Sequence, residues 1–102
     1  NSSQQINQFV QELLQHTVEH QPEIDGWIKE TVEHWSFDRI AVLDRNILRL
    51  AIAELLYISN IPVRVTINEA VELAKRFSTK DSGKFVNGIL DKIVQDKNIV
   101  KD

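Results

Sequence analysis

The stretch DRNILRLAIAELLYI, residues 44 to 58, decides the fold of this chain. Apolar or aromatic side chains occupy positions 47, 48, 50 to 53 and 55 to 58, so no continuous polar stripe can be drawn along it. A helix of this kind belongs in the middle of a bundle. A strand is the competing interpretation, but the run continues without Gly, Pro or alternation for longer than a typical strand. Its two interior charges, Arg49 and Glu54, must therefore lie near an edge or find partners.

Two amphipathic helices are predicted before this central helix. Residues 4 to 20 place apolar residues at helical spacing, and Pro22 ends that helix because the residue before a proline is pushed out of the α region. The same proline suits the first turn of a second helix over residues 22 to 35. The apolar residues of the first helix are Ile6, Phe9, Val10, Leu13, Leu14 and Val18, and those of the second are Ile24, Trp27, Ile28, Val32 and Trp35.

Short connections are expected on both sides of the central helix. Before it, Ser36 or Asp38 can cap a turn over residues 39 to 42. After it, Ile61-Pro62 forces an extended link. Residues 63 to 65 are β-branched at two of three positions and have no strand to pair with, so they are predicted to form an extended connector.

Two more helices are predicted in the last third of the chain. Thr66 and Glu69 match the capping-box pattern, with Thr66 as the N-cap of a helix over residues 66 to 77. A final helix is expected to start at Thr79 or Asp81 and to end near residue 95. Residues 96 to 102 are charged and are expected to fray.

These elements predict an all-α bundle of about five helices around the central buried helix 44–58. With 102 residues, the chain has room for one domain, and no apolar run approaches the roughly 18 residues of a membrane span. Because the first residue is Asn1 rather than Met, we expect residues 1–102 to be a single domain that is incomplete at its N-terminus. Gly26 and Gly88 fall inside predicted helices, so another backbone is expected close to each.

The distribution of charge restricts where an anionic partner can bind. A net charge of −3 argues against a broad surface for phosphate backbones. Residues 1 to 38 contain a single Lys and no Arg, whereas residues 39 to 102 contain the other eleven basic residues. An anionic partner is therefore expected to meet the second part of the chain.

No catalytic or cofactor-binding constellation is recognisable, so no enzyme activity and no cofactor are expected. The chain has no Cys, Ser82 lacks the flanking glycines of a nucleophile elbow, and its three glycines are too isolated to form a phosphate loop. His16 and His20 are four residues apart, with Glu12 one turn earlier, a spacing that can bind a metal ion. No third ligand is identifiable, so a solvated polar face is expected there instead of a metal site.

The segment KDSGKF, residues 80 to 85, combines Lys80, Lys84 and Phe85 at the start of a predicted helix, a place that favours anions. A base stacked on an aromatic ring contributes about 1–3 kcal/mol, so Phe85 could bind RNA. The alternative is that Phe85 belongs to the core, which its spacing to Ile89 favours.

Three segments together resemble the NusB family of bacterial transcription antitermination factors. They are DRNILRLAIAELLY (44 to 57), IPVRVTINEAVELAKRF (61 to 77) and DSGKFVNGILDKI (81 to 93), in the family's order and spacing. The segment WSFDRIAVL (35 to 43) also fits the family's lead-in to the central helix.

The resemblance implies an all-helical cytoplasmic protein that binds boxA-type RNA of ribosomal operons together with a small-subunit ribosomal protein, NusE. Such a protein joins other Nus factors on RNA polymerase and suppresses premature termination. Lys84 and Phe85 would then face RNA beside Lys80 and Asp81, with Arg64 a weaker candidate. Asp81 would also border the protein partner, and Asp44 would lie on the ribosomal-protein side.

The family's Arg-rich N-terminal helix has no counterpart in residues 1–102. We therefore expect weaker RNA binding by this chain alone, and an uncovered apolar surface that can support a homodimer. Two alternatives remain open: a helical module that binds protein without RNA, and the NusB-like RNA-binding domain of a ribosomal RNA methyltransferase. The latter tends to contain FVNAVLR, whereas residues 85 to 92 are FVNGILDK, which favours the free-standing factor.

Overall fold

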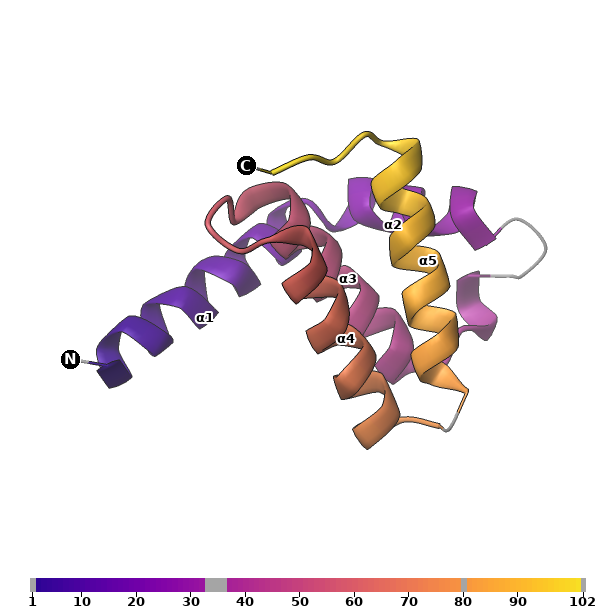
Figure 1. Ribbon diagram of the computed structural model, residues 1–102, viewed down its shortest axis with the longest axis horizontal. Helices are drawn as coiled ribbons and strands as arrows, with labels where there is room; N and C mark the ends of the chain where they lie inside the picture. The colour runs from indigo at the N-terminus through magenta and orange to yellow at the C-terminus, as the bar shows by residue number, and fades with distance from the viewer. Residues whose placement is uncertain (1, 33–36, 80, 102) are drawn as a thin grey trace.

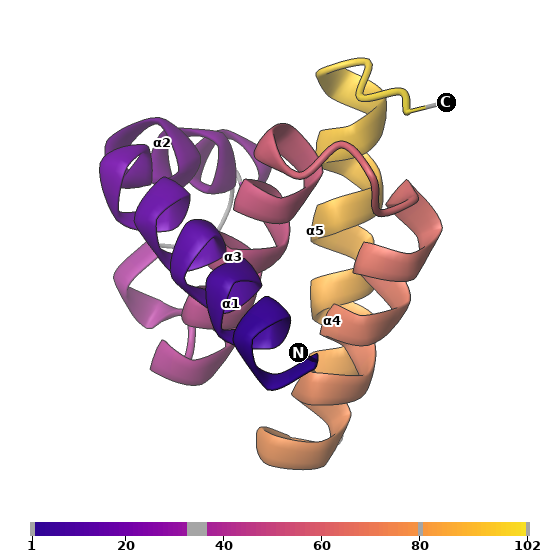
Figure 2. The ribbon, with the colours of Figure 1, turned by 90° about the vertical axis from the view of Figure 1, so that its left-hand side faces the viewer.

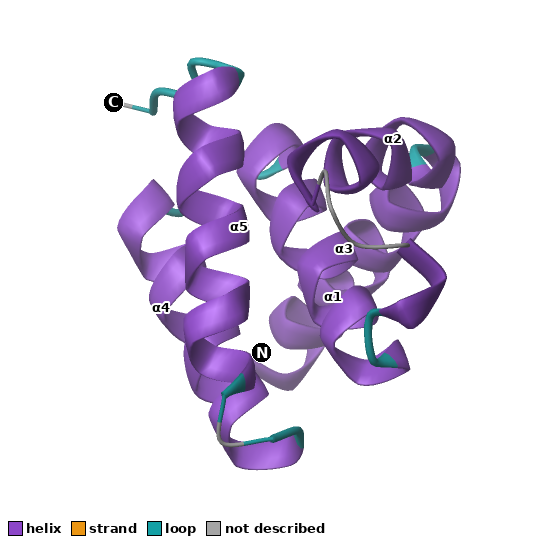
Figure 3. Ribbon diagram, turned by 90° about the vertical axis from the view of Figure 1, so that its right-hand side faces the viewer, coloured by secondary structure: helices purple, strands orange, loops and turns teal. Residues whose placement is uncertain are grey.

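The computed structural model describes residues 2–32, 37–79 and 81–101, and its described residues contain helices and loops but no strand (Figures 1 and 3). The all-α prediction with five helices is confirmed. Predictions for Trp35, Ser36 and Lys80 concern residues outside the described part of the chain. The elements are α1 (Ser2–Glu19), α2 (Gln21–Val32), the short 3-10 turn η1 (Phe37–Arg39), α3 (Val42–Tyr57), α4 (Val63–Phe77) and α5 (Ser82–Asp96).

The central helix of the prediction is α3, which contacts α1, α2, α4 and α5. Leu48 and Ile52 on α3 are completely buried, and they pack in one cluster with residues of α2, α4 and α5. Figure 2 shows α4 and α5 side by side along one flank of α3, with α1 and α2 on the other. The prediction of a buried central helix is confirmed, and the helix begins two residues earlier than expected, at Val42.

Both interior charges of α3 have partners. The Arg49 guanidinium donates from Nε to Asp25 Oδ1 at 2.7 Å and from Nη2 to Asp25 Oδ2 at 2.9 Å, which links α3 to α2. Thr66 Oγ1 donates to Glu54 Oε1 at 2.6 Å, which links α4 to α3. The expectation that Arg49 and Glu54 must be paired or lie at an edge is confirmed.

The start of α4 differs from the prediction. The helix begins at Val63 with Pro62 as its N-cap, and the Pro62 carbonyl accepts hydrogen bonds from the amides of Val65 and Thr66. The predicted extended connector over 63 to 65 is therefore wrong, as is Thr66 as an N-cap. The fixed φ of proline suits a helix start, and the Thr66 hydroxyl bonds to Glu54 on α3 instead of capping its own helix.

The close approach of two helices occurs at Gly83, where α4 and α5 pack together. A Cβ built on Gly83 would lie 2.7 Å from Lys75 Cγ, whereas Cβ atoms on Gly26 and Gly88 would meet nothing within 4 Å. The close backbone neighbours expected at Gly26 and Gly88 are therefore not found within the described part of the chain.

The described part of the C-terminal tail packs back on the bundle instead of fraying. Lys101 Nζ donates to the carbonyl oxygens of Glu54 (3.2 Å), Ile58 (2.8 Å) and Ile61 (2.8 Å). The ammonium thus pairs with carbonyls at the C-terminal end of α3 and in the loop after it, a place where the helix dipole favours a cation. Burial lowers the pKa of Lys101, and the nearby Glu54 carboxylate partly offsets that shift.

The apolar face of α1 is largely uncovered. Figure 1 shows α1 extending away from the body, and the large side chains Ile6, Val10, Leu14 and Val18 are exposed. Between α1 and α4 lies a hollow of about 120 Å³ with α3 as its floor, lined by Leu13, Leu50 and Leu73 among others. No helix among the described residues is long and apolar enough to cross a membrane.

Candidate nucleic-acid interface

A buried polar node ties the start of α5 to the start of α3. Ser82 Oγ donates to Asp44 Oδ2 at 2.8 Å, and the two residues are 38 positions apart in the sequence. Ser82 Oγ also lies 3.0 Å from Ser78 Oγ and 2.9 Å from Thr79 Oγ1, and it accepts a hydrogen bond from the Thr79 amide. This node orders the turn between α4 and α5 and so positions the first turn of α5, where the predicted RNA residues lie.

A cavity of about 160 Å³ opens next to this node. It is lined by Arg39, Ile40, Ala41, Asp44 and Phe85. Asp44 is 7% exposed, and its Oδ1 is buried without a hydrogen-bond partner, so a hydrogen-bond donor entering from the cavity could pair with it. The structure thus brings together Asp44 and Phe85, which the sequence analysis assigned to two different partners.

The Phe85 ring is half-buried: it packs against the core and also lines the cavity. The expectation that Phe85 belongs to the core is therefore partly met, and its contact with RNA stays a prediction. Lys84 and Asp81 next to it are exposed. Asp81 is the N-cap of α5 but makes no capping hydrogen bond with its side chain.

Arg64 does not join this group. It lies in the first turn of α4 instead of a connector, and its Nη2 is 3.5 Å from Asp91 Oδ1 on α5. Asp91 is seven residues after Lys84, which corresponds to roughly 10 Å along a helix. Asp81, Lys84 and Phe85 therefore lie together at the start of α5, whereas Arg64 contacts the second half of that helix.

Sequence reasoning missed two contributors to this surface. Arg39 is exposed and lines the cavity beside Phe85, and the motif WSFDRIAVL that resembled the family contains it. Ser82 was considered only as a nucleophile and discarded, whereas its role is to hold Asp44.

Ser82→Ala is expected to lower the free energy of unfolding by about 1–3 kcal/mol, because the buried Asp44 carboxylate loses a charge-assisted hydrogen bond. Urea denaturation followed by circular dichroism measures the loss. The exposed Ser59→Ala is the matched control and should stay within about 0.5 kcal/mol of the wild type. Equal stabilities of both variants would show that the node contributes nothing.

The fold and the surface define an all-helical module in which a half-buried aromatic ring, an exposed arginine and a buried carboxylate line one cavity, with an exposed lysine next to the ring in the sequence. The chain matches the NusB family over residues 1–95 and belongs to that family. The transcription antitermination protein NusB of Desulfitobacterium hafniense (strain Y51) is 51% identical to it over 90 residues, which cover 88% of this chain and 61% of the relative. That of Thermotoga maritima is 56% identical over 73 residues, covering 72% of this chain and 51% of the relative.

Two solved structures share the fold. The T. maritima NusB structure superposes with a TM-score of 0.80 and 50% identity, covering 82% of this chain and 59% of that chain. A chain from "Crystal Structure of a Plectonemic RNA Supercoil" superposes with a TM-score of 0.84 and 33% identity, covering 89% of this chain and 66% of that chain. The present chain thus spans about three fifths of the length of the first of these curated relatives.

Proposed function

We propose that this chain acts in transcription antitermination, binding boxA-type RNA of ribosomal operons together with the small-subunit ribosomal protein NusE. Its membership of the NusB family and the names of its relatives support the proposal. The observation that carries it is the cavity that Phe85 and Arg39 line, with the exposed Lys84 next to Phe85 in the first turn of α5. A ring for stacking and two cations for phosphates are the parts that a single-stranded nucleic acid needs.

Local charge has to carry the RNA contacts, because the chain as a whole has a net charge of −3. Arg39 is exposed and lines the cavity with Phe85, and Lys84 is exposed and directly precedes Phe85 in the sequence. Each phosphate neutralised on a single strand contributes about −0.7 to the slope of log affinity against log salt. Two such contacts supply modest affinity, which agrees with a function that requires a second protein.

The experiment is a titration of the preformed complex of this chain and the ribosomal protein with boxA-type RNA and with a scrambled RNA of equal length. We expect the boxA-type RNA to bind at least roughly tenfold more tightly, a difference of about 1.4 kcal/mol. A stable protein complex that binds both RNAs equally weakly would support the alternative, a helical module that binds protein only. Failure to bind the ribosomal protein would contradict both.

The proposed function requires no catalysis. The chain works in the cytoplasm, with other Nus factors and RNA polymerase as further partners of the assembly. The second alternative, the RNA-binding domain of a ribosomal RNA methyltransferase, predicts a catalytic domain encoded downstream of Asp102. Reading the gene downstream of that codon separates this alternative from the free-standing factor.

The homodimer belongs to the same proposal, with a second copy of the chain covering the exposed face of α1 and the adjoining hollow. Apolar patches of this kind are typical of interfaces. Val10→Glu is expected to weaken self-association at least roughly tenfold, because a carboxylate would be buried unpaired. Light scattering over a concentration series measures this. Val100→Glu, at an exposed position in the tail, is the control, and a wild type that stays monomeric throughout excludes the dimer.

A further inference from the structure

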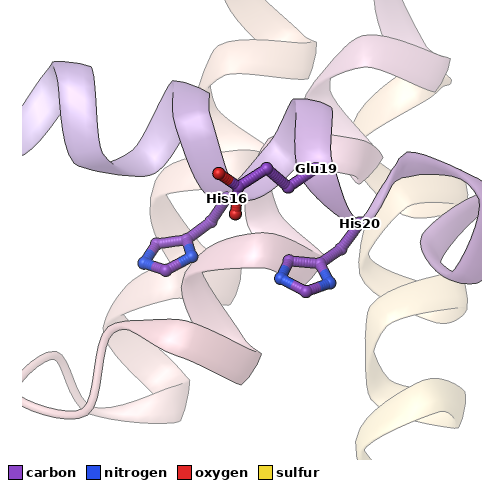
Figure 4. A group of neighbouring side chains, drawn as sticks. All are labelled: His16, Glu19 and His20. Carbon is purple, nitrogen blue, oxygen red and sulfur yellow. The ribbon is translucent and has the colours of Figure 1, made fainter.

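The end of α1 and the residue after it carry two imidazole rings and a carboxylate in one cluster. His16 and His20 have ring centroids 6.2 Å apart and planes inclined by 23°, and Figure 4 shows both rings on the same side of the helix. One ligand atom from each of His16, Glu19 and His20 lies within 4.8 Å of the other two. The third group that the sequence analysis could not identify is therefore Glu19.

Tyr57 at the end of α3 holds the two rings in place. Its ring stacks on His16 at 4.8 Å and on His20 at 4.3 Å between centroids. Tyr57 is partly buried and packs against the core, so it forms a firm support for both imidazoles. Burial raises the pKa of Tyr57, with Glu23 adding to the shift, so this ring stays an uncharged phenol at neutral pH.

The hydrogen bonding of the cluster leaves coordinating atoms available. His16 Nδ1 is buried and has no hydrogen-bond partner, although an unpaired polar atom costs free energy there. His16 Nε2 lies 3.8 Å from Glu12 Oε1, and Gln15 Nε2 donates to Glu19 Oε1 at 2.9 Å. Since 3.8 Å is beyond hydrogen-bonding distance, neither ring nitrogen of His16 is occupied by a hydrogen bond among the described residues.

We propose that His16, Glu19 and His20 bind one divalent transition-metal ion, with Zn²⁺ as the representative of the class. Imidazole and carboxylate ligands suit this class of ion, and three protein ligands leave a position for water. Ligand atoms around a tetrahedral Zn²⁺ are roughly 3.4 Å apart, so the three groups must approach one another by somewhat more than about 1 Å. Rotation of the exposed Glu19 side chain and small ring movements can supply this.

The ion would stiffen the junction between α1 and α2. The His20 amide donates to the His16 carbonyl at 3.0 Å, and the His20 carbonyl accepts from the Ile24 amide in α2 at 3.0 Å. A metal ion bound to His20 would therefore restrict the residue that joins the two helices. The site shares no residue with the surface around Phe85, so it stands independently of the proposed RNA function.

Isothermal titration of the tag-free chain with Zn²⁺ alone tests the site. We expect one ion per chain, and affinities at least about tenfold weaker for His16→Ala and for His20→Ala, since even outer partners of a metal ligand contribute that much. Glu19→Gln should weaken binding severalfold; this side chain is exposed, so the variant does not endanger the fold. A wild type that binds no Zn²⁺, or a His16→Ala/His20→Ala double variant that binds it equally well, overturns the proposal.

Two controls separate this site from general binding by surface groups. His34→Ala removes the remaining histidine of the chain, and Glu30→Gln removes an exposed carboxylate that pairs with Lys97 at 3.1 Å. Both should bind Zn²⁺ as the wild type does. Nuclear magnetic resonance of the imidazole protons gives a second readout, because the ion should shift the signals of His16 and His20 and leave those of His34 in place. Shifts confined to His34 would also overturn the proposal.

Discussion

Phe85→Ala is expected to weaken binding of boxA-type RNA by the complex with the ribosomal protein by roughly 5- to 150-fold. The range corresponds to about 1–3 kcal/mol for the loss of one stacked base. Phe85 is the aromatic side chain that lines the cavity beside Asp44 and Arg39. Fluorescence anisotropy with labelled RNA measures the affinity. The same measurement over a series of salt concentrations tests Lys84→Ala, for which the slope of log affinity against log salt should be smaller by about 0.7 than in the wild type.

Because Phe85 also packs against the core, a second variant has to separate stacking from stability. Phe85→Leu keeps an apolar side chain in the core and removes the ring face, so it should lose RNA affinity and retain the thermal midpoint better than Phe85→Ala. Phe77→Ala is the matched control, since this ring is 60% exposed at the end of α4 and does not line the cavity. Wild-type affinity in both Phe85 variants would remove the ring from the RNA surface.

Asp25→Ala is expected to lower the free energy of unfolding by about 2–3 kcal/mol. Asp25 and Arg49 form a two-pronged ion pair with side chains 15% and 18% exposed, and its loss leaves a mostly buried guanidinium without its carboxylate. Removing one partner of a fully buried pair costs about 3–5 kcal/mol, and the residual solvent exposure places this pair below that range. Urea denaturation gives the value.

A double-mutant cycle distinguishes the unpaired charge from lost packing. Arg49→Met combined with Asp25→Ala should be less destabilised than the sum of the two single variants, because the double variant buries no unpaired charge. Asp91→Ala is the control, since its pair with Arg64 at 3.5 Å is exposed and should contribute less than about 1 kcal/mol. Strictly additive single effects would mean that Arg49 and Asp25 do not stabilise α2 against α3 as a pair.

Local patterning in the sequence predicted which segments are helical and which helix is central. The continuous apolar run of α3 and the helical spacing of apolar residues elsewhere show which side of each helix turn is buried. This pattern can be read from residues close together in the sequence, without knowledge of the fold. The same reasoning predicted that Arg49 and Glu54 need partners, but it could not name Asp25 and Thr66. The family and the group Asp81, Lys84 and Phe85 also came from contiguous motifs, and the family is confirmed while the roles of these residues stay predictions.

What depends on contacts between distant segments could not be read from local patterns. Three hydrogen bonds join residues far apart in the chain: Ser82 to Asp44, Lys101 to Ile58, and Thr66 to Glu54. The last of them accompanies the early start of α4. An amphipathic pattern likewise says that α1 has an apolar face, but only the packing shows that Ile6 and Val10 are left uncovered.

The amino-acid order alone thus determined the helices, their sequence along the chain and the apolar faces they offer, since each is a property of residues within a few turns of one another. The tertiary structure decided which faces meet, that Asp44 and Phe85 share one cavity, and that Tyr57 stacks on both histidines. Those outcomes depend on how rigid helices pack in three dimensions and on the side-chain rotamers that the packing selects, and neither is encoded in the period of a single helix.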